Sequence, residues 1–181
     1  MGFGTCSLKG YKEAMEIFDP ARIKKVVERS LYRTGKQVRT RASSAIRSGY
    51  NIKKENLDKN IIVERATMEV KLRCSGKNLN AREYGPVTQS RVLGAIINIR
   101  RDRPNKVISH SFIINKFGGK VFLRKGKSRF PIVPVTGPSV KQLMGSKYIG
   151  KVIQKTLNEV AQKNFDAQLK AVTGATVDLP E

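Results

Sequence analysis

The segment at residues 121–144 reads VFLRKGKSRFPIVPVTGPSVKQLM, and its pattern predicts a strand, a turn, a second strand and a helix. Its first three residues have high strand propensity. Gly126 lies among cations and a serine, which indicates a basic turn. Pro131 and Pro134 follow the turn, and because proline cannot donate a ladder hydrogen bond, they keep the second strand out of the middle of a sheet.

A helix start follows the second strand. Gly137 ends the strand, Pro138 fixes one backbone angle, and the hydroxyl of Ser139 can accept a hydrogen bond from a free amide of the helix. The helix carries three apolar residues, Val140, Leu143 and Met144. The whole segment contains no catalytic nucleophile, metal cluster or carboxylate pair, which favours a role in assembly.

The same segment resembles a family signature. An Arg-Lys-Gly-x-x-Arg-x-Pro-Ile run occupies residues 124–132, and Gly-Pro-Ser-Val at 137–140 leads into a turn that ends in methionine. This combination is similar to the minor tail protein Z, or tail completion, family of long-tailed bacteriophages. The residues that carry the likeness are Gly126, Pro131, Gly137, Pro138, Ser139 and Met144.

The resemblance extends more loosely over most of residues 20–172, including the basic first helix, the run at 49–57 and the closing helix. It implies a structural virion protein that completes the head-proximal end of the tail and makes the tail competent for head–tail joining. It further implies a homo-oligomeric ring, hexameric by analogy, with the tail terminator, tail tube and connector as partners. Its location would be the tail or neck of the virion, and the host cytoplasm during assembly.

Charge is the strongest feature of the composition. Lysine and arginine number 36 against 14 aspartates and glutamates, a formal net charge of +22. Such an excess bears on partners and solubility rather than on the fold, and it predicts a polyanion or an acidic protein surface as partner. Cys6 and Cys74 are too few for a disulfide framework and lack metal spacing. No apolar run approaches the ~20 residues of a bilayer span, so we expect no membrane partner.

A long first helix is predicted to begin at Asp19–Pro20 and to run to Ser48. Asp19 can accept hydrogen bonds from free backbone amides, and proline fits the first helical position. Phe18 and Ile23 are spaced to form a hydrophobic staple around this start. Gly49 is expected to end the helix.

Two further helices are predicted. A short helix at residues 53–59 places Leu57 inward. The closing helix runs from roughly Lys147 to Val172 with an apolar stripe of helical period, and Gly174 is expected to stop it.

Period-two alternation begins after residue 60. Residues 68–74 alternate apolar with charged side chains, which is typical of a half-buried strand, and 61–64 form either an earlier strand or the start of the same one. Residues 75–93 read as a long connection without secondary structure, of a kind that is often functional. Further strands are expected at 95–100, 107–109, 111–117 and 120–124, with Gly118–Gly119 as a two-residue hairpin turn between the last two.

The predicted fold class is therefore α+β: an antiparallel sheet of about four to five strands flanked by a long N-terminal helix and a long C-terminal helix. The predicted organisation is an N-terminal arm at 1–18, a single α+β domain at 19–174 and a C-terminal tail at 175–181.

The first helix carries a basic stripe. Five cations fall within a narrow arc at about 100° per residue, and we define the basic stripe by these residues: Arg22, Lys25, Arg29, Arg33 and Lys36. Such a stripe can track phosphates, or it can be an ordinary solvated helix face. The sequence does not decide between DNA and an acidic protein as its partner.

The predicted hairpin within residues 121–134 carries four cations, which we call the cationic tip: Arg124, Lys125, Lys127 and Arg129. They form either a docking finger or a charged device against edge-to-edge strand pairing, and the family resemblance favours docking. Tyr84–Gly85–Pro86 is either a second contact element or a simple turn.

The other residues with chemical potential favour structural roles. Four phenylalanines fall in strand periods and are predicted to be core residues rather than base-stacking ones: Phe112, Phe117, Phe122 and Phe130. His110, the single histidine, lacks a cysteine or carboxylate partner at ligand spacing. We therefore predict no catalytic, cofactor-binding or metal-binding residue and no enzymatic activity. The alternative to the tail-completion function is a nucleic-acid-binding basic module that contacts phosphate through its first helix.

Overall fold

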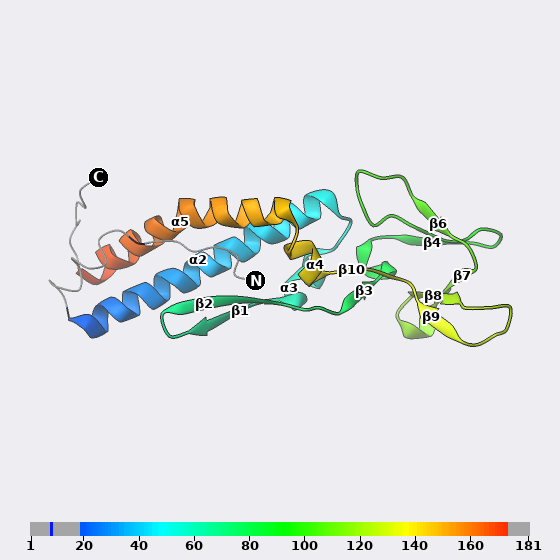
Figure 1. Cartoon of the computed structure of the whole chain (residues 1–181), viewed down its shortest axis with the longest axis horizontal. Helices are drawn as coiled ribbons and strands as arrows, with labels where there is room; N and C mark the ends of the chain where they lie inside the picture. The colour runs from blue at the N-terminus through cyan, green and yellow to red at the C-terminus, as the bar shows by residue number, and fades with distance from the viewer. Residues whose placement is uncertain (1–7, 9–18, 174–181) are drawn as a thin grey trace. The chain divides into compact units, whose positions relative to one another are not determined.

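The computed structural model of the chain describes Leu8 and residues 19–173. Its architecture is α+β, with a long N-terminal helix, small antiparallel sheets and a long C-terminal helix (Figure 1). The chain divides into two compact units. Of the described residues, the first comprises Leu8, 19–42, 61–73 and 146–173, and the second comprises 43–60 and 74–145.

The first unit is built on two long helices, α2 (Pro20–Gly49) and α5 (Lys147–Thr173). The predicted start of α2 is confirmed, because Asp19 Oδ1 accepts a hydrogen bond from the amide of Ala21 at 3.1 Å. The predicted staple depends on Phe18, and the predicted stop of α5 depends on Gly174. Both residues lie outside the described part of the chain, as do the remaining residues of the predicted arm and tail except Leu8.

Helices α2 and α5 lie side by side and bury an apolar cluster (Figure 1). Periodic spacing of apolar residues on both helices creates this contact. Its buried members are Ile23, Val26 and Val27 of α2 and Phe165 and Leu169 of α5, with Leu8 and Leu31 packed against them.

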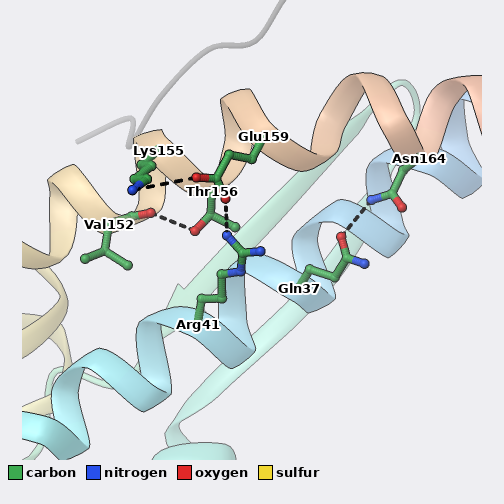
Figure 2. Close-up of polar contacts among 7 residues, drawn as sticks. All are labelled: Gln37, Arg41, Val152, Lys155, Thr156, Glu159 and Asn164. Carbon is green, nitrogen blue, oxygen red and sulfur yellow. Dashed lines mark hydrogen bonds and ion pairs between the residues drawn. The ribbon is translucent and has the colours of Figure 1, made fainter.

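Polar contacts continue the pairing of the two helices (Figure 2). Asn164 is buried, and its amide nitrogen donates to Thr34 Oγ1 and to Gln37 Oε1, both at 2.9 Å. Further along, Glu159 accepts from Arg41 and lies 3.9 Å from Lys155 Nζ. The contact between the helices therefore combines an apolar section with a section of specific hydrogen bonds and one ion pair, Arg41–Glu159, while Lys155 pairs with Glu159 within α5.

A two-stranded hairpin, β1 (Ile61–Ala66) and β2 (Glu69–Cys74), completes the first unit. Even-numbered residues of β2 are half-buried and odd-numbered ones are exposed, which confirms the predicted alternation for residues 69–74. Met68, predicted to belong to the same strand, instead lies in the turn with φ of 56° and is 38% exposed. The hairpin packs on α2 at Gly35, where a Cβ atom would lie 2.7 Å from Val70 Cγ1 and 3.2 Å from Val63 Cγ1. Glycine at this position therefore permits close packing of strand on helix.

The second unit begins with the end of α2 and with α3 (Lys54–Asn60), in which Leu57 is buried as predicted. Three small antiparallel sheets follow, with strand orders β4–β5–β6, β7–β8–β9 and β10–β3. The strands are β3 (Asn78–Asn80), β4 (Val87–Ser90), β5 (Gly94–Ile97), β6 (Lys106–Ile108), β7 (Ser111–Ile114), β8 (Lys120–Arg124), β9 (Ile132–Pro134) and β10 (Thr136–Ser139). Two short helices, η1 (Ala81–Tyr84) and η2 (Asn115–Phe117), and α4 (Val140–Met144) complete it.

The prediction of one sheet of four to five strands is wrong, because the strands divide among several small sheets. A polar side chain marks one division. The hydroxyl of Ser111 in β7 accepts from the amide of Ala95 in β5 at 2.9 Å and donates to the carbonyl of Ile108 in β6, so a side chain rather than a backbone ladder joins β7 to the neighbouring sheet. His110 precedes β7 with φ of 59°, a conformation that turns the chain out of strand geometry.

Two connections also differ from prediction. Residues 75–93 contain β3, η1 and β4 rather than a structureless loop. The link between β7 and β8 is longer than the glycine pair, because η2 occupies Asn115–Phe117 and Gly118 follows it in the left-handed conformation.

The side chain of Asn80 connects the segment at residues 75–93 to β8. Its side chain accepts from the amide of Val121 at 3.1 Å and donates to the carbonyl of the same residue at 3.2 Å. It also caps η1 by accepting from the amide of Arg82 at 3.1 Å. Around it, the core of the second unit contains Ala81, Ala95, Ile97 and Val121.

Candidate interaction surfaces

The basic stripe lies on the exposed side of α2. All five of its members are exposed, as the helical arc predicts. Lys36 Nζ lies 4.6 Å from the centre of the Tyr32 ring. Among residues 19–173, no carboxylate forms an ion pair with Arg22, Lys25, Arg29 or Arg33. Lys36 likewise has no ion pair with a described carboxylate, so all five positive charges are uncompensated by a close carboxylate in the described chain.

An open groove of about 420 Å³ lies between α2 and the turn of the β1–β2 hairpin. Arg65 extends the basic stripe across it, and its guanidinium lies 3.6 Å from the centre of the Tyr32 ring. The sequence analysis did not identify Arg65 as a candidate. The structure shows it as an exposed residue near the end of β1. The groove is lined by Lys25, Glu28, Arg29, Arg65, Ala66, Thr67, Glu69 and Val70.

The cationic tip belongs to the second unit, so it is a separate candidate from the stripe. Its four cations are exposed at and beyond the end of β8, and Gly126 in the bend has open space around it. The amide of Lys125 donates to the carbonyl of Pro131 at 3.2 Å and closes the base of the bend. Strand β9 pairs only with β8, which confirms that the proline-bounded strand stands at a sheet edge.

The other signature residues hold the segment that follows the tip. The ring of Tyr84 lies against Gly137, and its hydroxyl donates to the carbonyl of Pro138. Ser139 Oγ accepts from the amide of Gln142, whose side chain accepts in return from the amide of Ser139, so the predicted helix cap is confirmed as a capping box. Met144 is buried at the end of this helix, α4.

Tyr84 is therefore a core residue rather than an exposed contact element. It is among the largest fully buried side chains of the described chain. Burial raises the pKa of its hydroxyl above the usual range, with smaller contributions from Tyr50 and Glu83. The phenol remains a neutral hydrogen-bond donor throughout the ordinary pH range.

Phenylalanines cluster on one face of the β7–β8–β9 sheet. The rings of Phe112 and Phe122 face each other across the strands with centroids 6.5 Å apart, and the Phe117 ring lies 5.9 Å from that of Phe122. The guanidinium of Arg124 lies 5.2 Å from the centre of the Phe112 ring. The prediction that the phenylalanines are core residues is wrong for Phe117 and Phe130, which are 53% and 65% exposed, and it is not confirmed for Phe112 and Phe122, which are only half-buried.

Positive charge dominates the sequence around these surfaces. Residues 103–158 contain no aspartate or glutamate but twelve lysines and arginines. Within residues 74–145 the two carboxylates are both engaged: Asp102 binds Arg100 at 2.6 Å, and Glu83 accepts from the amide of Asn80 at 3.3 Å. The hydrogen bond from Arg100 lowers the pKa of Asp102.

Other chemically capable residues have local explanations. His110 is exposed in the turn before β7, and burial raises the pKa of the half-buried Cys74 thiol. Within residues 19–173, no group of three His, Cys, Asp or Glu side chains is arranged to hold a metal ion. None of the helices formed by these residues has both the length and the apolar character of a membrane span.

Comparison with known proteins gives no relative: no protein-family model matches the chain, no curated protein matches its sequence, and no solved structure matches its fold.

Proposed function

We propose that this chain is a structural virion protein that completes the head-proximal end of a phage tail and enables head–tail joining. The observation that carries the proposal is the segment at residues 121–144, whose sequence resembles the tail-completion family. In the structure, the signature residues that follow the cationic tip are held in place by specific contacts. Gly137 and Pro138 contact Tyr84, and Ser139 caps α4. These contacts fix the backbone on one side of the exposed cations.

The role proposed is contact rather than catalysis. In the proposed assembly the subunit repeats around the tail axis as a ring, with six copies by analogy with the family. A ring of this kind needs two different side surfaces that close by rotation. Its neighbours in the proposal are the tail terminator, the tail tube and the connector, and the positive charge of the chain is complementary to acidic surfaces on such partners. Complementary charge of this kind sets register and encounter rate.

Gene disruption tests the proposal in a phage whose genome carries this chain. We expect filled heads and finished tails that fail to join, and joining should return when the purified chain is added to the mixture. Mass spectrometry of purified wild-type particles should detect the chain, and an electron density map should place it at the tail–head junction. Its absence from those particles, or normal joining without it, would refute the proposal.

Charge reversal adds a test at residue level. Arg124→Glu with Lys127→Glu cancels the net positive charge of the cationic tip. Arg29→Glu with Arg33→Glu reverses two charges in the middle of the basic stripe. We expect each pair of substitutions to lower infectious yield if the surface that it changes binds an acidic neighbour. Arg101→Glu with Arg103→Glu is the matched control, since both residues are exposed in a loop outside the two surfaces.

A second function is favoured by the exposure of the basic stripe. The five cations of the stripe have no carboxylate partner among residues 19–173, and together with Arg65 across the groove they suit contact with a phosphate backbone. This reading predicts DNA or RNA affinity whose logarithm falls with the logarithm of salt concentration by about 0.9 per phosphate contact. Affinity independent of salt, or no binding at about 100 mM salt, where the Debye length is about 10 Å, would reject it.

A further inference from the structure

The β7–β8–β9 sheet has one face that the described chain leaves open. Residues paired across the strands, and every second residue along them, share a face. Register therefore assigns one face, which we call the Phe–Arg face, to Phe112, Ile114, Lys120, Phe122, Arg124, Ile132 and Pro134. All seven are half-buried or exposed, whereas the opposite face contains the buried Ser111 and Val121.

We infer that the Phe–Arg face docks a protein partner whose surface presents an apolar patch rimmed by carboxylates. Aromatic residues and arginine are the types enriched where protein interfaces are buried. Phe122 stands at the centre of this face, with Phe112 and Pro134 directly opposite it on the two flanking strands. Phe117, 53% exposed, widens the apolar area.

Charge selects the partner. Lys120 and Arg124 are exposed on the Phe–Arg face, and the cationic tip begins at its edge. Because residues 103–158 contain no carboxylate and both carboxylates of residues 74–145 are engaged locally, this part of the chain supplies no charge to balance them. Two copies of the face would repel each other, so its occupant is a different, acidic protein.

The ring geometry disfavours single-stranded nucleic acid on this face. Bases stack on open aromatic faces, but Phe122 is tilted by 31° to Phe112 and by 56° to Phe117, so these rings meet one another. The guanidinium of Arg124 lies over Phe112. Aliphatic Ile114 and Ile132 occupy the rest of the face, and they offer contact area rather than a stacking plane.

The inference deepens the proposed function, on which it rests for identifying the partner as an assembly neighbour. It places contact with that neighbour on the second unit and leaves contacts between copies of the subunit to other surfaces. The partner chemistry itself is testable without particles.

Fluorescence anisotropy with the full chain at about 150 mM salt, where the Debye length is about 8 Å, tests the inference. The probes are a labelled peptide that alternates glutamate with leucine, a polyglutamate peptide of equal charge, and a twenty-nucleotide oligothymidylate. We expect the alternating peptide to bind more tightly than polyglutamate, because only it offers apolar contact. The variant Phe117→Ser with Arg124→Ser should bind it roughly tenfold more weakly, the scale of a moderate interface truncation.

A matched control keeps the test specific. Val92→Ser with Arg103→Ser removes the same kinds of group at exposed positions outside the face, with Val92 91% exposed, and should keep wild-type affinity. Thermal melting checks that both variants fold. Equal binding of the two peptides, or equal losses in both variants, would overturn the inference. Tighter binding of oligothymidylate that depends on Phe117 and Arg124 would overturn it in favour of nucleic acid. None of these results bears on whether particles contain the chain.

Discussion

The ring of Tyr84 lies so close to Gly137 that a Cβ atom at residue 137 would stand 2.6 Å from Cε2 of the tyrosine. The hydroxyl of the same tyrosine donates to the carbonyl of the next residue, Pro138. One buried side chain thus holds the strand β10 immediately before the helix cap at Ser139. This contact gives the glycine of the signature segment a physical reason.

Gly137→Ala should destabilise the protein. The added methyl meets an aromatic ring that is itself fully buried, and overpacking of this kind costs about 1–3 kcal/mol. Thermal or urea unfolding of the full chain measures the change. Gly126→Ala is the control, because nothing lies within 4 Å of a Cβ at that position, and its free energy of unfolding should stay close to wild type. Equal stability of the two variants would contradict the contact.

Tyr84→Phe tests the hydroxyl separately from the ring. The variant keeps the packing against Gly137 but leaves the carbonyl of Pro138 without its donor, a loss of about 1–2 kcal/mol in the free energy of unfolding. Tyr148→Phe, on the exposed surface of α5, should change stability little. If the two substitutions shift the urea midpoint equally, the hydrogen bond does not stabilise the fold.

Local signals in the sequence predicted the helices well. The start at Asp19–Pro20, the cap at Ser139 and the burial of Leu57 depend on neighbours a few residues away, and the structure confirms all three. The stripe on α2 followed from helical period alone, and its exposure is confirmed.

The division of the strands could not be predicted in the same way, because it depends on contacts between segments far apart in the chain. Asn80 binds the backbone of Val121, and Ser111 binds the backbone of Ala95; neither pairing has a local signature. Phe117 was misjudged for a related reason. Period two implies a buried face only while the strand continues, and η2 takes this residue out of the strand.

Glu159→Gln should alter the acid stability of the α2–α5 pair. The hydrogen bond from Arg41, with the nearby positive charges, lowers the pKa of Glu159 below its ordinary value of about 4.3. A carboxyl whose pKa is lower in the folded state contributes stability above the unfolded pKa, and that contribution is lost as pH falls through the folded pKa. The glutamine variant should therefore be less stable than wild type near neutrality, and the difference should vanish in acid.

Melting temperatures of both proteins between pH 7 and about pH 2 measure this convergence. The ion pair is partly exposed, so we expect a small effect that added salt weakens. A difference that is constant across the whole pH range would show that the carboxylate charge is not its source.

Asn164→Ala should cost about 1–3 kcal/mol in the free energy of unfolding. The buried amide donates to both Thr34 and Gln37, and removal leaves the buried hydroxyl of Thr34 without this donor. Asn158→Ala makes the same change in the same helix at an exposed position, where it removes only a contact with Gln154. Because the helix propensity term is shared, the difference between the two variants isolates the interhelix hydrogen bonds.

Gly35→Ala sets two effects against each other. Alanine favours a helix interior by up to about 1 kcal/mol over glycine, but here its methyl would lie 2.7 Å from Val70 Cγ1. Because the hairpin packs closely at this point, we expect the clash to win and the free energy of unfolding to fall. Val70→Ala in the same chain removes the nearest obstructing methyl group and leaves only the looser 3.2 Å approach to Val63 Cγ1, so Gly35→Ala should destabilise that background less than it destabilises wild type. A double-mutant cycle measured by urea unfolding gives the coupling energy. If Gly35→Ala has the same effect in both backgrounds, β2 does not pack against α2 at this glycine.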